Sequence, residues 1–141
     1  MECRSLNTVS NNLSEDIRFD GVDWNFAPAN PGTYVILDND EIVYVGMAGR
    51  NGKGSLRNRL KDHASGQIVN MFAQYLFLTR AQFLYENENR IDHPREAQTA
   101  CRNYIKERCS FQFLATDDAA GARDLEKRLK AELNPALNPL P

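Results

Sequence analysis

Two short runs of β-forming residues, separated by a polar turn, constrain the fold of this chain most strongly. Residues 33–37 (TYVIL) and 41–46 (EIVYVG) are rich in β-branched and aromatic side chains, which favour extended backbone. The Asp-Asn-Asp triplet at 38–40 between them has the composition of a tight turn. The sequence therefore predicts an antiparallel hairpin with polar residues at its tip.

Further elements follow the hairpin without any internal repeat. Residues 56–64 have the pattern of a helix that Ser55 can cap. Residues 95–108 have the pattern of an amphipathic helix that starts at Pro94. The alternating residues 111–115 predict a third strand.

A final helix follows the predicted third strand. Thr116 or Asp117 can cap it, and its buried face comprises Ala122, Leu125, Leu129 and Leu133. Between residues 67 and 92 the sequence signals are weaker. The hydrophobic residues of 68–76 recur at helical spacing, and residues 82–85 have the pattern of a short strand. The mixture of strands and helices, without a low-complexity linker, predicts one α+β domain over residues 1–141.

Residues 1–30 are polar and irregular, and we expect them to form an N-terminal extension. Five of their side chains are hydrophobic enough to be buried: Ile17, Phe19, Val22, Trp24 and Phe26. Their spacing predicts short extended pieces that pack on the core.

The overall composition is that of an ordinary globular protein, with 42% hydrophobic residues. The N-terminus lacks the apolar stretch of a signal peptide, and no apolar run approaches the roughly 18 residues of a membrane span. The three cysteines, Cys3, Cys101 and Cys109, do not make a disulfide framework. We therefore expect a cytoplasmic protein with reduced thiols and no membrane partner.

Positive charge is concentrated in one short segment, although the formal net charge is −2. The charged side chains of residues 1–49 are mostly acidic, and residues 64–141 hold equal numbers of acidic and basic side chains. Between them, Asp62 is the single acid beside five basic residues: Arg50, Lys53, Arg57, Arg59 and Lys61. Such a patch can contact phosphates, but basic runs are also commonly solvated helix faces, so charge alone does not choose between the two.

Several polar residues stand at spacings that a purely structural role does not require, and together they resemble the GIY-YIG nuclease family. The first motif of that family resembles Gly32-Thr33-Tyr34, and the second resembles Tyr44-Val45-Gly46. The helix motif resembles Leu56-Arg57-Asn58-Arg59-Leu60 with His63, and the C-terminal part resembles Phe111-Gln112-Phe113-Leu114, Leu125-Glu126 and Asn134 to Asn138. The resemblance covers residues 32–63 and 111–138, and five weak motifs in the right order make it specific.

The resemblance implies a small three-stranded antiparallel sheet flanked by helices, with a helical insertion at residues 64–110 between the first helix and the third strand. It also implies an endonuclease that hydrolyses phosphodiester bonds with one divalent ion, magnesium or manganese. Nucleic acid is then the partner, with DNA favoured over RNA. The oligomeric state stays open.

The residues at the motif positions suit that chemistry. Glu126 is a hard oxygen ligand of the kind that magnesium prefers, and Arg59 offers a planar fork to a phosphate. Tyr34 or Tyr44 would position or deprotonate the attacking water, which requires a nearby cation to lower the phenol pKa. The other expected roles are proton transfer by His63, bracing of the site by Asn138, and substrate contacts by Arg50, Lys53, Arg57 and Lys61.

Some of these residues also have a purely structural interpretation. Glu126 could simply pair with Arg123 or Lys130 on its own helix. Met47 departs from the family, which often has lysine there; Lys53 or Arg50 could supply that charge. Two other functions stay open: a nucleic-acid-binding module of the same fold that has lost turnover, and a nuclease for RNA or a nucleotide-derived molecule.

Overall fold

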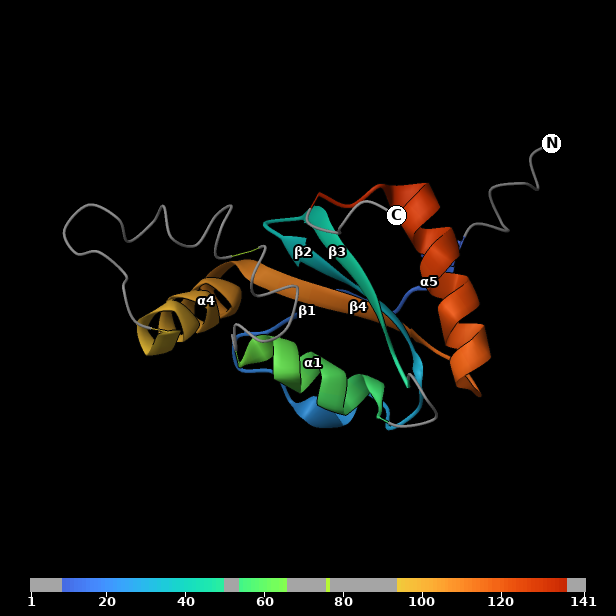
Figure 1. Cartoon of the computed structure of the whole chain (residues 1–141), viewed down its shortest axis with the longest axis horizontal. Helices are drawn as coiled ribbons and strands as arrows, with labels where there is room; N and C mark the ends of the chain where they lie inside the picture. Colours follow the sequence, from blue (N-terminus) through green and yellow to red (C-terminus); the bar gives the residue numbers. More distant parts are fainter. Residues whose placement is uncertain (1–8, 50–53, 66–75, 77–93, 137–141) are drawn as a thin grey trace.

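The protein, seen in a computed structural model, is described for residues 9–49, 54–65, 76 and 94–136. These residues form a four-stranded antiparallel sheet with the strand order β1-β4-β2-β3 (Figure 1). The strands are β1 (Ile17–Arg18), β2 (Gly32–Asp38), β3 (Glu41–Ala48) and β4 (Cys109–Ala115). The α+β class is as expected, but the expected count of three strands is wrong.

The additional strand, β1, comes from the N-terminal extension. Ile17 pairs with Phe111 and Arg18 pairs with Ser110, so β1 extends the sheet beyond β4. Two residues are too few for period-two alternation to show in a sequence, which is why the pattern did not reveal a strand here. The extension is therefore part of the sheet.

The predicted hairpin is confirmed, with each strand slightly longer than its apolar run. Asn39 and Asp40 at its tip have φ values of 48° and 72°. Both lie in the left-handed region that a tight two-residue hairpin turn requires and that Asn and Asp tolerate. The register shifts by one residue between Ile36 and Leu37, so that Ile36 lies opposite Tyr44 and Tyr34 lies opposite Gly46.

Three helices accompany the sheet: α1 (Leu56–Ala64), α4 (Pro94–Arg108) and α5 (Ala119–Leu133). The Ser55 hydroxyl accepts the amide N–H of Asn58 at 3.1 Å, so the predicted cap of α1 is confirmed. The cap predicted for α5 is wrong, because Asp118, and not Thr116 or Asp117, accepts the amide N–H of Gly121. Thr116 instead donates its hydroxyl to the carbonyl of Asp118 at 2.8 Å.

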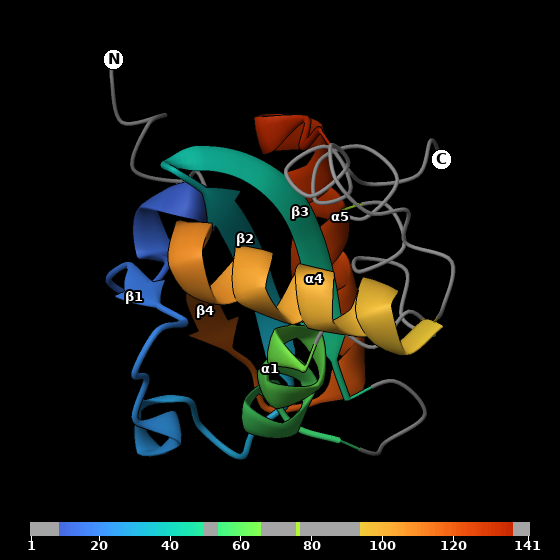
Figure 2. The same cartoon turned by 90° about the vertical axis from the view of Figure 1, so that its left-hand side faces the viewer.

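The sheet is covered on both faces (Figures 1 and 2). The helices α1 and α4 pack on one face, in a core with Tyr34, Ile36, Tyr44, Leu56, Leu60, Cys101, Ile105 and Phe111. The helix α5 and the short 3-10 helix η2 (Val9–Asn12) cover the other face, around Val35, Leu37, Val45 and Leu129. Residues 34–37 of β2 therefore alternate between the two cores, whereas in β3 both Val43 and Tyr44 lie on the α1 and α4 side and Val45 lies on the other.

The segment before β2 also packs on the α1 and α4 side. Phe19 is buried, and Trp24, in the 3-10 helix η3 (Trp24–Phe26), stacks on Phe111 with ring centroids 5.9 Å apart. The expectation that Phe26 is buried is wrong, because its side chain is 63% exposed. The 3-10 turn differs from the expected extended pieces, and it rotates Phe26 away from the core.

Some expectations concern residues outside the described part of the chain. They include the predicted helix at 68–76, apart from the buried helical residue Leu76, and the predicted strand at 82–85. Cys101 and Cys109 are buried thiols. Among the helices that the structure describes, none combines the length and apolar character needed to cross a membrane.

Candidate active site

Tyr34 lies at the centre of the group of predicted site residues. Its side chain is fully buried, and the residue opposite it in the hairpin is Gly46. A Cβ atom added to Gly46 would overlap the hydroxyl and ring carbons of Tyr34. The glycine of the second motif is thus required because the phenol lies directly against the backbone of β3. This close approach directs the Tyr34 hydroxyl toward α1.

His63 receives that hydroxyl. The Tyr34 Oη atom lies 2.5 Å from Nε2 of His63, which faces inward from the last turn of α1 and is fully buried. Tyr44 completes a triangle of rings, with its centroid 6.5 Å from that of Tyr34 and 5.6 Å from that of His63. Tyr34 and Tyr44 share a sheet face because they are diagonal neighbours in the hairpin register.

Arg59 lies one turn before His63 on α1, as the four-residue spacing predicts. It is half-buried and interacts with Tyr34 through charge and a side-chain hydrogen bond. Burial by itself lowers the pKa of Arg59, but the influence of Tyr34 and Tyr44 leaves that pKa above its usual value. The guanidinium is therefore a fixed positive charge beside the two phenols.

Burial raises the pKa of Tyr34 far above that of a free phenol, and the neighbouring Tyr44 raises it further. Arg59 acts in the opposite direction but is outweighed. Arg59 thus lowers this pKa as expected, but burial outweighs its effect, and Tyr34 is a neutral phenol. Because a guanidinium can only donate, the Tyr34 oxygen accepts from Arg59 and its proton is directed at Nε2 of His63.

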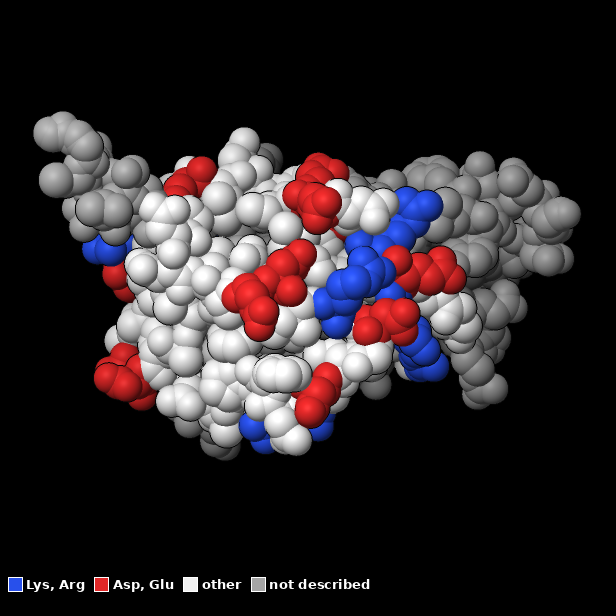
Figure 3. Space-filling view, turned by 180° about the vertical axis from the view of Figure 1, so that it is seen from behind, with Lys and Arg blue, Asp and Glu red and all other residues white. Residues whose placement is uncertain are grey.

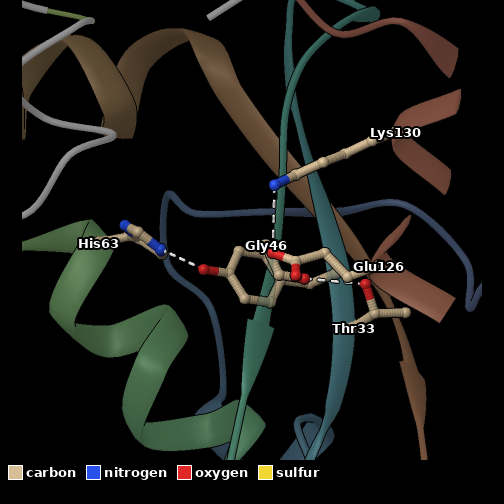
Figure 4. Close-up of polar contacts among 6 residues, drawn as sticks. Thr33, Gly46, His63, Glu126 and Lys130 are labelled. Atoms are coloured by element: carbon tan, nitrogen blue, oxygen red, sulfur yellow. Dashed lines mark hydrogen bonds and ion pairs between the residues drawn. The ribbon is translucent and has the colours of Figure 1, made fainter. Parts of the chain in front are cut away.

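Glu126 approaches from the other side of the hairpin. Figure 4 shows His63 projecting from α1 and Glu126 projecting from α5. The Glu126 side chain is 12% exposed, and its charge contributes to the raised pKa of Tyr34. Its Oε2 atom lies 3.6 Å from Nζ of Lys130, whose side chain is 40% exposed. The pairing with Lys130 on the same helix therefore exists, and it coexists with the position of Glu126 beside Tyr34.

The donors present fit a hydrated hard cation and not a zinc site. Within the described ranges, no three His, Cys, Asp or Glu side chains are close enough to hold one metal ion. Magnesium needs only one or two carboxylates and keeps several of its waters, whereas structural zinc takes four protein ligands. Among the described carboxylates, Glu126 is the one whose charge acts on Tyr34, so it is the residue that would hold such an ion.

The four predicted substrate-contacting residues differ in their surroundings. Arg57 donates its Nε–H to the carbonyl of Ala27 at 2.8 Å, so part of its function is to hold η3 against α1. Lys61, one turn later, is exposed on the outer side of α1. Arg50, Lys53 and Asn138 lie outside the described residues. Of the ten predicted residues, the structure groups five: Tyr34, Tyr44, Arg59, His63 and Glu126.

Charge on the rear of the molecule is mixed. Figure 3 shows basic side chains gathered over one part of that face, with acidic side chains directly beside them. Among the residues that the structure describes, this face therefore carries no continuous basic surface of the kind that duplex binding by charge alone requires.

Two residues near the site were missed as participants from sequence. Thr33 is buried and donates its hydroxyl to the carbonyl of Gly46 at 2.8 Å, which ties the two hairpin motifs together. Lys130 was considered only as a structural partner of Glu126. The signal for it was present, since residues four apart on a helix are neighbours.

Comparison with known families agrees with the geometry. The sequence matches the family described as the GIY-YIG catalytic domain over residues 20–139. The match begins just after β1 and includes the whole of residues 64–110. A comparison with curated proteins finds no match. The match spans most of the chain, which therefore belongs to the GIY-YIG family of phosphodiester hydrolases.

Proposed function

We propose that this protein is an endonuclease that hydrolyses phosphodiester bonds in DNA with one magnesium or manganese ion. The observation that carries the proposal is the Tyr34–His63 hydrogen bond, on whose phenol the charges of Arg59 and Glu126 both act. A fold that needed these positions only for packing would not require a buried hydroxyl in contact with a buried imidazole, with a half-buried guanidinium acting on the same hydroxyl.

The neutral state of Tyr34 suggests how the attacking water is activated. A water beside the phenol oxygen gives its proton to Tyr34 as Tyr34 passes its own proton to Nε2 of His63. His63 must therefore be neutral and able to accept at Nε2 before the reaction. The water oxygen forms a bond to phosphorus while the bond from phosphorus to the 3′-oxygen breaks, and the released oxygen takes a proton from solvent.

The charges around this relay suit the phosphate. Arg59 provides a bidentate donor for the non-bridging oxygens, on which negative charge accumulates in the transition state. Tyr44 lies next to both Tyr34 and His63, where its ring excludes water and orients the imidazole. A divalent ion held by Glu126 would neutralise the phosphate and stabilise the leaving oxygen.

Nicking of supercoiled plasmid by the purified full chain tests the proposal. We expect nicking with magnesium or manganese, none with EDTA, and none by Glu126→Gln. The matched control is Asp124→Asn, because Asp124 is a 65% exposed carboxylate on the same helix that pairs with Arg128. Equal nicking by wild type and Glu126→Gln would overturn the proposal. Parallel reactions with RNA and with nucleotides decide between DNA and those alternative substrates.

A second function is a nucleic-acid-binding module that has lost turnover. The observation in its favour is the ion pair of Glu126 with Lys130, which already neutralises the one carboxylate of the site. This function predicts binding of DNA without cleavage, and no manganese binding that depends on Glu126.

A further inference from the structure

A cavity of about 280 Å³ lies at the end of α1, and none of the residues of the candidate active site lines it. The segment between β1 and η3, the end of α1, and α4 surround it, and Figure 2 shows these three segments next to one another. It is lined by Phe19, Gly21, Val22, Trp24, Ala64, Arg102, Ile105 and Lys106. The volume is near the lower end for small-molecule pockets, which start at roughly 300 Å³, so it suits one nucleotide and excludes a duplex.

The inner wall of the cavity is aromatic and rigidly supported. The Trp24 ring is stacked on the buried Phe111 at an interplanar angle of 10°, and Phe19 packs against Phe111 with centroids 4.9 Å apart. Trp24 itself is only half-buried. Because Phe111 and Phe19 support it from behind, the indole is held in place before any ligand arrives, and a base could stack on it without a large ordering cost.

The rim of the cavity is basic. Arg102 and Lys106 are exposed residues four apart on α4, so they lie on one face of that helix. Arg102 donates its Nε–H to the carbonyl of Ser65 at 3.3 Å, which holds its guanidinium over the end of α1. Two cations beside an aromatic wall are the combination that recognises a nucleotide: a stacked base and an anionic phosphate.

The cavity lies close to the candidate active site along α1. His63 faces inward to Tyr34, and the next residue, Ala64, lines the cavity. The two sites thus lie on different sides of α1, and a helix with its side chains is about 10–12 Å across. That width corresponds to about three nucleotides of a stacked strand at 3.4 Å per nucleotide. A strand whose phosphate lies at Arg59 can cross α1 and reach the cavity.

We propose that this cavity binds an unpaired nucleotide of the substrate, with the base against Trp24 and a phosphate on Arg102 and Lys106. The inference rests on the proposed nuclease function and names its substrate class: a strand with an unpaired nucleotide a few positions from the bond that is cut. A base within an intact duplex is stacked on both sides and does not reach such a pocket without leaving the helix.

Trp24 is the single tryptophan of the chain, so its fluorescence reports on this cavity directly. We expect a short single-stranded oligonucleotide, added in EDTA to prevent cleavage, to quench Trp24 in a saturable way. A blunt-ended duplex of two fully complementary strands should bind at least about tenfold more weakly, because stacking of one base contributes about 1–3 kcal/mol. Quenching by a nucleoside monophosphate but not by the oligonucleotide would overturn the proposal, and so would equal quenching by the duplex.

Paired variants test the basic rim. Arg102→Gln with Lys106→Gln should weaken binding of the single strand by about tenfold or more. The control, Arg123→Gln with Lys127→Gln, removes the same charge from exposed positions of α5 and should change the affinity less than about twofold. Circular dichroism and the melting temperature check that both variants are folded. Equal weakening by the two pairs would show general charge attraction and overturn the assignment of this rim.

Failure of this inference can be distinguished from failure of the nuclease function. Saturable quenching of Trp24 by the single strand, in a protein that never cleaves, leaves the cavity assigned and overturns the nuclease. Cleavage of DNA without quenching, and without any effect of the rim variants, leaves the nuclease and overturns the cavity.

Discussion

The two halves of the candidate active site differ in burial and in charge. On the α1 side, Tyr34 and His63 are buried, joined by a 2.5 Å hydrogen bond and surrounded by aromatic rings. On the α5 side, Glu126 and Lys130 are joined by a looser ion pair that reaches solvent at Lys130. The buried half is assembled before substrate binds, whereas the charged half can exchange one cation for another.

This difference separates two requirements of a metal-dependent hydrolase. The α1 half would transfer protons, and it does so best in fixed geometry. The α5 half would hold a divalent ion, and its ion pair must open before that ion can bind. Variants in the two halves should therefore fail in different ways.

The largest effect is expected for Glu126→Gln. Loss of the carboxylate should remove both manganese binding, measured by calorimetry or electron paramagnetic resonance, and cleavage, by at least about 1,000-fold. Unchanged manganese affinity in this variant would place the ion elsewhere and remove the distinction between the halves.

Tyr34→Phe should lose about 100- to 10,000-fold in cleavage rate, because it removes the hydroxyl that links water to His63. Its manganese affinity should stay near that of wild type, since the variant leaves Glu126 in place. The measurement is single-turnover cleavage beside a calorimetric titration of the same sample. A variant that cleaves at the wild-type rate would exclude the phenol from proton transfer.

Gly46→Ala tests the packing that positions the phenol. The added methyl group overlaps the Tyr34 side chain, so we expect a loss of about 1–3 kcal/mol in the free energy of unfolding. Gly121→Ala is the control, because that glycine lies in the first turn of α5 and a Cβ atom added there would lie 3.2 Å from Oδ1 of Asp118, which is a tight contact without overlap. Equal stability changes in the two variants, from urea unfolding, would mean that Tyr34 moves aside without cost.

The smallest effect is expected for Lys130→Met. Removal of the competing ammonium should tighten manganese binding by up to about fivefold, in keeping with the modest strength of exposed ion pairs. Arg128→Met, which breaks the exposed pair with Asp124, should leave the affinity unchanged. Weaker manganese binding in Lys130→Met would show that Lys130 supports the site and does not compete for it.

The hairpin and the α1 residues could be predicted because their signals are local. The Asn39-Asp40 turn joins β2 to β3, and helix periodicity alone places Arg59 and His63 one turn apart. The last helix and its buried face followed from the same periodicity. The approach of Glu126 to Tyr34 could be expected only from the family resemblance, because the two residues are far apart in sequence.

The rest depends on tertiary context that sequence patterns do not encode. The β1 strand forms because β4 offers an open edge to Ile17 and Arg18, and no two-residue pattern signals that. The pKa of Tyr34 is raised overall because burial outweighs the lowering by Arg59, and no local sequence pattern reports that burial. The cavity beside Trp24 needs three separate segments to meet, so no single stretch of sequence could indicate it.

A crystal structure of the protein soaked with manganese, with the ion located by its anomalous scattering, tests the central claim most directly. The account predicts one ion on the Glu126 carboxylate, with the Tyr34 hydroxyl and the Arg59 guanidinium facing it and Lys130 released from its ion pair. An ion bound away from Glu126, or none there while the Glu126–Lys130 pair persists at saturating manganese, would contradict it.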